Sequence, residues 1–216
     1  MSYIAERRIE ERERRRNEIL DAAEALYAKV GWDSLTVDQV ARGARLSRAL
    51  VYVYFRDKEE LLFGIGERAM RELRARFVAA AAEHISGIDK VQALGRAYMT
   101  YANDLPHYFD ACTRFNQHSD AADEGGTAGD CGAAGDLVIA EVVQAIEAGK
   151  LDRSIRADVG NSMLLAVSLW TFTHGVIQIA MSKGEDFARL GIDSPQLVDY
   201  AFGLIRHMAT ADTSAA

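Results

Sequence analysis

Residues 36–55 read Thr-Val-Asp-Gln-Val-Ala-Arg-Gly-Ala-Arg-Leu-Ser-Arg-Ala-Leu-Val-Tyr-Val-Tyr-Phe, and this stretch decides the fold. Thr36 and Gln39 are spaced as a capping box, which predicts that a short helix begins at Thr36. Ser47 is a favourable N-cap for a second short helix, and Phe55 closes that helix. A turn of about three residues separates the two. The stretch therefore predicts a helix-turn-helix, whose second helix fits the major groove of DNA.

The charge of the chain is distributed unevenly. The 216 residues carry a net charge of −7, yet residues 1–60 hold equal numbers of acidic and basic side chains. Within residues 42–58, five basic side chains stand against one acidic side chain. A cationic patch on an otherwise acidic chain suits a polyanionic partner such as DNA. The structural alternative is a helical hairpin whose basic face is merely solvated.

Apolar residues recur at helical spacing on both sides of this stretch. They predict a first helix that ends at Gly31, and later helices over residues 58–84, 88–104, 106–118, 136–149, 158–183 and 194–208. Residues 119–135 contain five glycines and predict a mobile loop. No stretch alternates as a strand does, so the predicted fold class is all-α.

The charged run at residues 6–16 has two interpretations. It is either a solvated helical extension or an arm that brings basic side chains near phosphates. The arginines of that arm would be Arg12, Arg14, Arg15 and Arg16.

Other functional classes find little support in the sequence. Cys112 and Cys131 are too few for a disulfide framework and indicate a reducing compartment, either as inert thiols or as a redox pair. The start of the chain lacks the apolar core of a secretory signal. Residues 163–181 are uncharged and approach the length of a membrane span, but their scattered polar side chains favour a buried helix. No catalytic, metal-ligating or cofactor-binding pattern is present, so we expect no catalytic residues, no metal, no cofactor and a cytoplasmic location.

Residues 15–63 resemble the DNA-binding domain of the TetR family of bacterial transcriptional regulators. The resemblance is carried by Ile19-Leu-Asp-Ala-Ala, Gly31, Leu35-Thr36-Val37, Val40-Ala41, Ser47-Arg48, Tyr52, Tyr54-Phe55 and Lys58-Glu-Glu-Leu61-Leu62. It implies a three-helix DNA-binding domain over residues 1–57 and a helical effector-binding and dimerisation domain over residues 58–216. The expected protein is a homodimeric repressor that a small-molecule effector releases from a palindromic double-stranded operator. The alternatives are an activator or protein-responsive regulator of the same fold, and a helical carrier or enzyme with an incidental basic hairpin.

The resemblance also assigns contacts with DNA. It implies that Thr36, Tyr52, Tyr54 and Lys58 contact phosphate, and that Arg48 and Ala49 lie nearest the bases. The sequence departs from the family pattern at three positions, where Arg45 replaces a turn glycine, Leu50 a hydroxyl residue and Asp38 a basic residue. If the left-handed turn is kept, an arginine there costs about 1 kcal/mol. The predicted DNA-binding residues are Thr36, Arg45, Ser47, Arg48, Ala49, Leu50, Tyr52, Tyr54 and Lys58.

By the same resemblance, the middle of the chain holds a ligand cavity and its last two helices form the dimer interface. Pockets are mostly apolar, so the effector is expected to be largely apolar, whereas ordinary core packing is the structural alternative for each residue. Two helices from each of two chains would form a four-helix interface. The predicted effector-pocket residues are Tyr98, Met99, Tyr101, Phe109, Phe115, Trp170, Phe172 and His174. The predicted dimer-interface residues are Gly175, Gln178, Leu197, Tyr200, Ala201, Leu204, Ile205 and Met208.

Overall fold

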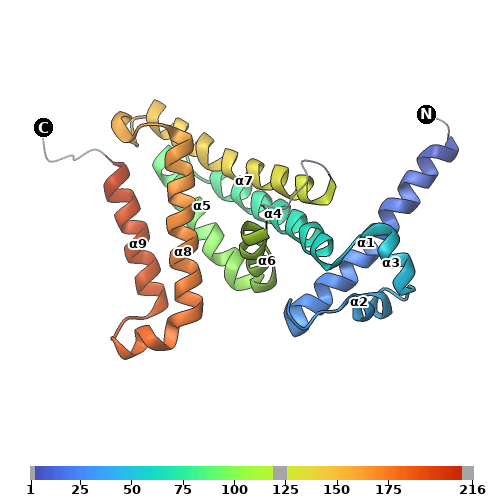
Figure 1. The fold of residues 1–216 in the computed structure, drawn as a ribbon. Helices are drawn as coiled ribbons and strands as arrows, with labels where there is room; N and C mark the ends of the chain where they lie inside the picture. Colours follow the sequence, from blue (N-terminus) through green and yellow to red (C-terminus); the bar gives the residue numbers. More distant parts are fainter. Residues whose placement is uncertain (1–2, 119–125, 211–216) are drawn as a thin grey trace, which may run out of the picture. The chain divides into compact units, whose positions relative to one another are not determined.

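The computed structural model describes residues 3–118 and 126–210, which form helices and connecting turns without a strand (Figure 1). The predicted all-α fold class is confirmed. The helices are α1 (Tyr3–Val30), α2 (Val37–Gly43), α3 (Arg48–Tyr54), α4 (Lys58–Ala82), α5 (Gly87–Asp104), α6 (Pro106–His118), α7 (Gly126–Leu151), the 3-10 turn η2 (Ala157–Val159), α8 (Ser162–Arg189) and α9 (Ser194–Ala209).

The chain packs as two compact units. The first comprises residues 1–70 and 105–134, and the second comprises residues 71–104 and 135–216. The boundary expected at residue 57 falls inside the first unit, because the start of α4 packs with α1–α3. Leu61, Leu62 and Ile65 of α4 belong to the same buried cluster as Val51 and Phe55. Helices α4 and α7 each contribute residues to both units.

Short-range signals place the first three helices where the sequence predicts them. Helix α1 ends at Val30, directly before Gly31, which adopts φ +76°. Thr36 caps α2 in a capping box with Gln39, and Ser47 caps α3. Beneath these caps, Val40 and other apolar residues of the helix-turn-helix are fully buried. The surface of the motif is therefore held on a rigid core.

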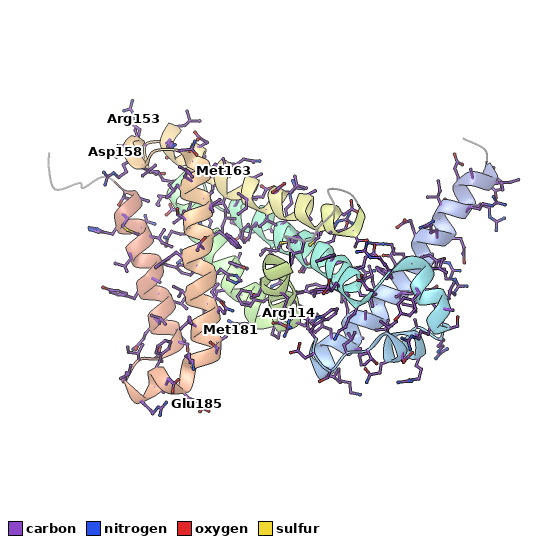
Figure 2. The ribbon with its side chains drawn as sticks, in the orientation of Figure 1. Arg114, Arg153, Asp158, Met163, Met181 and Glu185 are labelled. Atoms are coloured by element: carbon purple, nitrogen blue, oxygen red, sulfur yellow. The ribbon has the colours of Figure 1, made fainter. Side chains whose placement is uncertain are left out.

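A hydrogen-bonded network fixes α6 against α1 within the first unit. The hydroxyl of Tyr27 donates to Asp110 of α6 at 2.6 Å. Arg114, which Figure 2 labels, donates to Asp110 at 2.9 Å and to both carboxylate oxygens of Asp33 at 3.0 and 3.1 Å. Burial, followed by the bond to Asp110, raises the pKa of Tyr27. The phenol is thereby kept protonated as the donor of this network.

Residues 126–135 form a packed helix, so the mobile loop expected over residues 119–135 is wrong for this part. Residues 119–125 lie outside the described residues. Cys131 is fully buried, and a Cβ added to Gly66 of α4 would stand 2.8 Å from its Sγ. Small residues on both helices thus permit close packing. Burial raises the pKa of Cys131 to about 12, which favours the inert thiol over a reactive one.

The second unit depends on a close crossing of α5 and α7. A Cβ on Gly87 would lie 2.0 Å from the backbone nitrogen of Gly149, so only glycine fits there. The turn after α7 caps the start of α5, because Asp152 accepts from the Gly87 amide at 2.7 Å. Ser154 accepts from the amide of Ile88 at 3.0 Å.

Helices α8 and α9 pack side by side and antiparallel (Figure 1). Helix α8 begins after its N-cap Asn161, whereas the predicted start at residue 158 lies in η2. Its backbone breaks at Lys183 (φ −124°, ψ 17°), next to the predicted end, and the helix then continues to Arg189. Helix α9 begins with Asp193 as N-cap and Pro195 in its first turn, close to the predicted start.

Among the described residues, α8 is one helix that is long and apolar enough to cross a membrane. Met163 and Met181 lie near the two ends of its uncharged stretch (Figure 2). Only 22% of its most apolar window is buried in the single chain, in contrast to the prediction. Length and composition alone are weak evidence of a membrane span, since core helices of soluble proteins meet the same criterion.

Candidate nucleic-acid interface and ligand cavity

The outer face of α3 presents an arginine that two neighbouring side chains hold in place. The Arg48 guanidinium lies 3.3 Å from the carboxylate of Asp38 and donates to the hydroxyl of Tyr52 at 3.2 Å. It also lies 5.4 Å from the centroid of the Tyr52 ring. The hydrogen bond to Tyr52 and the charge of Asp38 raise the pKa of Arg48. Because the side chain remains 59% exposed, the cation is oriented yet accessible to a guanine edge or a phosphate.

The turn between α2 and α3 keeps its left-handed residue although no glycine is present. Arg45 adopts φ +57°. The turn closes through hydrogen bonds from the Arg45 amide to the Arg42 carbonyl (3.1 Å) and from the Leu46 amide to the Ala41 carbonyl (2.9 Å). The strain of about 1 kcal/mol is therefore present. The turn also places the exposed guanidinium of Arg45 between the two helices.

Lys58 begins α4 and is anchored on the segment that precedes α2. Its Nζ donates to the carbonyl of Trp32 at 2.6 Å and lies 4.7 Å from the centroid of the Trp32 ring. Partial burial lowers the pKa of Lys58. An ammonium carries three donors, so the bond to Trp32 leaves others for a phosphate.

The hydroxyls of Thr36 and Ser47 serve as helix caps. Thr36 Oγ1 accepts from the Gln39 amide at 3.3 Å and donates to Gln39 Oε1 at 2.9 Å. Ser47 Oγ accepts from the Leu50 amide at 3.1 Å, which leaves its proton available to a phosphate. The geometry thus favours a phosphate contact from Ser47 over one from Thr36.

All nine predicted DNA-binding residues are at least partly exposed on α2, α3 and the segments that flank them. Ala49 and Tyr52 are exposed, whereas Leu50 and Tyr54 are half-buried. Tyr54 packs its ring against the buried cluster of the first unit. The arrangement presents cations and hydroxyls on one small motif, which is the chemistry that duplex DNA binds.

The second unit contains a narrow apolar cavity between its helices. Its volume is about 50 Å³, little more than a few water molecules occupy. Interiors are close-packed, so a ligand of many atoms must push side chains or helices apart. The cavity is lined by Leu73, Phe77, Val91, Gln92, Leu94, Gly95, Tyr98, Val138, Ile139, Val142, Leu169, Trp170, Thr173, Phe202 and Ile205.

A few polar groups stand at the wall of this cavity. The hydroxyl of Tyr98 lies 2.7 Å from Nδ1 of His174. Burial lowers the pKa of His174, which favours the neutral imidazole. Gln92 donates to the carbonyl of Phe202 at 3.0 Å and so ties α5 to α9. An apolar space with few placed polar groups is typical of small-molecule sites.

Residues 19–65 match the model of the tetR family of bacterial regulatory proteins. A segment of 51 residues is 43% identical to HbdR, an HTH-type transcriptional regulator of Aromatoleum sp. (strain CIB). Over these residues the chain is similar to the DNA-binding segment of TetR-family regulators.

The likeness to curated relatives is confined to part of each chain. The HbdR match covers 24% of this chain and 22% of HbdR. The HTH-type transcriptional repressor Rv1474c of Mycobacterium tuberculosis (strain ATCC 25618 / H37Rv) is 31% identical over 74 residues, which are 34% of this chain and 38% of the repressor. The chain therefore matches less than two fifths of the length of either relative.

The likeness of fold extends further. A solved structure of the transcriptional regulator FadR from Bacillus subtilis in complex with stearoyl-CoA matches with a TM-score of 0.67 and 14% identity. The match covers 88% of this chain and 97% of FadR. At this identity the match establishes the fold alone.

Two of the eight predicted effector-pocket residues line the cavity, and a third contacts both of them. Tyr98 and Trp170 line it. His174 is hydrogen-bonded to Tyr98, and its ring centroid lies 5.9 Å from that of Trp170.

The other five predicted pocket residues do not line the cavity. Phe109 and Phe115 belong to the first unit, where Phe115 meets Phe63 edge-on at 5.7 Å. Tyr101 is fully buried against Tyr98, and Met99 is half-buried; Phe172 is exposed. Long-range packing decides which face of each helix meets the cavity, so aromatic size alone does not identify the lining.

Sequence reasoning missed several lining residues. Gln92 lies within a run of buried apolar residues on α5, and a polar side chain in such a run was the available signal. Thr173 and Phe202 carry no comparable signal, because their place follows from the packing of α8 and α9.

The predicted dimer-interface residues divide between two faces of α8 and α9. Ala201 and Ile205 are buried within the chain, and Ile205 lines the cavity, so neither is free to meet a partner. Gly175 and Leu197 are half-buried. The exposed members are Gln178, Tyr200, Leu204 and Met208.

Proposed function

We propose that this chain is a homodimeric DNA-binding transcriptional regulator. The observation that carries the proposal is the helix-turn-helix, on which Asp38 and Tyr52 orient an exposed Arg48. A guanidinium on the first residue of such a helix can fork onto a guanine edge in the major groove. The relatives HbdR and Rv1474c, both HTH-type regulators by name, support the proposal.

The exposed apolar side of α8 and α9 supports dimerisation. Here we call it the α8–α9 face, and its exposed residues include Leu164, Gln178, Tyr200, Leu204 and Met208. Exposed apolar area costs about 25 cal/mol per Å², so covering this face stabilises the pair. Two chains place their recognition helices about 34 Å apart on a palindrome, which gives one small motif the affinity it lacks alone.

We propose further that a largely apolar effector occupies the cavity of the second unit. The stearoyl-CoA of FadR makes a fatty-acyl group a suitable first candidate. Leu73 and Phe77 of α4 line the cavity, and the same helix begins at Lys58 of the helix-turn-helix. A ligand that prefers a widened cavity shifts the population of dimer geometries, and a coupling of about 1–3 kcal/mol weakens operator binding 5- to 150-fold.

In this proposal the regulator is a cytoplasmic repressor without cofactor, metal or catalytic role. The word repressor in the name of Rv1474c favours repression over activation. An activator would use the same contacts, because the sign depends on where the operator lies.

The proposal is tested by selecting a duplex from a random pool with the wild-type protein. We expect binding to the selected duplex to exceed binding to a scrambled duplex, and to fall steeply with salt. Arg48→Ala should reduce the preference by about 1–3 kcal/mol. Stearoyl-CoA and shorter acyl-CoA thioesters, with free CoA as control, then test release. A wild-type protein that binds neither duplex at low salt would contradict the proposal.

A further inference from the structure

Helix α1 extends well beyond the core of the first unit. We call residues 3–14 the arm; all of them are exposed, and the first fully buried residue of α1 is Ile19. Arg14 and Arg15 each form ion pairs with Glu11 and Glu18, at distances between 2.6 and 3.2 Å. Such i, i+3 and i, i+4 pairs stabilise an isolated helical segment. These pairs support the helix where the arm leaves the core.

The charges of the arm are partly segregated, with Glu11 as the acid that lies among the arginines. At 3.6 residues per turn, the acidic side chains Glu6, Glu10 and Glu13 share one face. Arg8 and Arg12 lie on the opposite face, Arg7 lies beside it, and all three border the last residue of α3 in one groove. That groove is lined by Tyr3, Ile4, Arg7, Arg8, Glu11, Arg12 and Tyr54.

The arginines of this face differ from those nearer the core. Arg14 and Arg15 are engaged by glutamates, and Arg16 lies 3.7 Å from Glu67 and over the ring of Phe55. By contrast, the three groove arginines form no ion pair with another described residue. Glu11, the acid of the groove, is already neutralised by Arg14 and Arg15, which lower its pKa. The groove therefore presents an uncompensated positive charge.

We propose that this basic face binds the DNA backbone beside the segment that α3 occupies. The groove arginines Arg7, Arg8 and Arg12 would contact phosphates, and Tyr54 marks where the two contact surfaces join. Charge complementarity and continuity with α3 support a phosphate backbone as the partner. The inference rests on the proposed function and extends its footprint. It also replaces Arg14, Arg15 and Arg16 as the candidate contacts of the charged run.

The test compares two triple variants of the full-length protein on the duplex selected by the wild type. Each phosphate contact contributes about 0.9 to the slope of log affinity against log salt. Arg7→Ala/Arg8→Ala/Arg12→Ala should therefore lower the magnitude of the slope by about 2–3 for each chain. The preference for the selected over the scrambled duplex should persist, because phosphate contacts carry no sequence information. Hydroxyl-radical footprints should lose backbone protection at the flanks of the site.

Glu6→Ala/Glu10→Ala/Glu13→Ala is the matched control on the opposite face of the arm. Alanine favours the helix in both variants, and circular dichroism verifies that each remains folded. The control should keep the wild-type slope and footprint. An arginine variant with the wild-type slope, or a control whose slope changes as much, would overturn the arm proposal. In either case wild-type binding that depends on Arg48 would leave the proposed function standing, whereas absence of wild-type binding would remove both.

Discussion

The outer surface of α3 and the α8–α9 face are both exposed in the single chain, but they expose different chemistry. The first displays the cation of Arg48, which water hydrates, so it is stable without a partner. The second displays apolar side chains such as Leu164 and Tyr200, about 70% exposed, whose contact with water is unfavourable. The difference teaches that DNA contact is conditional and salt-dependent, whereas the contact between chains is expected to be permanent.

The largest expected effect follows from a charge on the α8–α9 face. Leu204→Glu places a carboxylate and its symmetry copy in the interface between chains. An unpaired buried charge costs about 3–5 kcal/mol, so the dimer dissociation constant should rise at least roughly a hundredfold. Sedimentation equilibrium measures the change.

Val78→Glu is the control for this variant. Val78 is an exposed apolar residue of α4 outside the α8–α9 face, and its replacement should leave the dimer intact. Equal dimer dissociation constants in both variants would show that the α8–α9 face is not the interface. The α3 surface should retain its weak, salt-dependent binding to a single half-site in the Leu204→Glu monomer.

The next largest effect is expected from Asp38, which both orients the Arg48 guanidinium and places a negative charge on the α3 surface. Asp38→Asn removes the carboxylate that lies 3.3 Å from Arg48. Affinity for the scrambled duplex should rise, because an anion near the phosphates is gone, while preference for the selected duplex should fall by about 1–2 kcal/mol. Fluorescence anisotropy on both duplexes measures the two quantities. If the preference remains at the wild-type value, Asp38 does not orient the guanidinium.

The same two regions show what sequence can predict. The caps at Thr36 and Ser47, and the end of α1 at Gly31, were predicted because each signal acts within about four residues. The retained left-handed turn at Arg45 follows from the same local pattern. The helix-turn-helix is almost entirely composed of such local features, so its helices and turn could be placed from the sequence, while its contacts with DNA stay a prediction.

Helix α6 and the start of α7 were predicted less well, because their packing in the first unit depends on residues far away in the sequence. The helix at residues 126–135 is stabilised where Cys131 meets Gly66, which is 65 positions away in the sequence. Glycines in a row indicate a loop unless such a partner is known. Likewise, Phe109 packs in the first unit because α6 contacts α1, and no local sequence pattern reveals that contact.

A fall in pH should destabilise both compact units, because each contains one histidine that burial keeps neutral. Burial lowers the pKa of His174 in the second unit and of His107 in the first. As pH falls below about 6.5, both histidines become protonated in the unfolded chain but stay neutral in the folded chain. The free energy of unfolding therefore decreases. One group contributes at most about 1.4 kcal/mol per pH unit.

Urea titrations between pH 7 and pH 5 measure this dependence. His174→Gln and His107→Gln should each flatten it in part, and the double variant should flatten it most. Gln is chosen at position 174 because its amide can still bond to Tyr98. A single variant with the full wild-type dependence would show that its histidine does not contribute.

The smallest effect compares two arginines that share a strained backbone, one in each unit. Arg45 and Arg153 adopt φ +57° and +63°, where glycine is unstrained. Replacement by glycine relieves about 1–2 kcal/mol of steric strain but adds chain entropy to the unfolded state, so each variant should gain a few tenths to about 1 kcal/mol. Only Arg45→Gly should also weaken DNA binding, with a salt slope smaller by about one, because only Arg45 lies in the helix-turn-helix. Equal loss of DNA affinity in Arg153→Gly, or a loss of stability in Arg45→Gly, would contradict the assignment of strain and contact to the same turn.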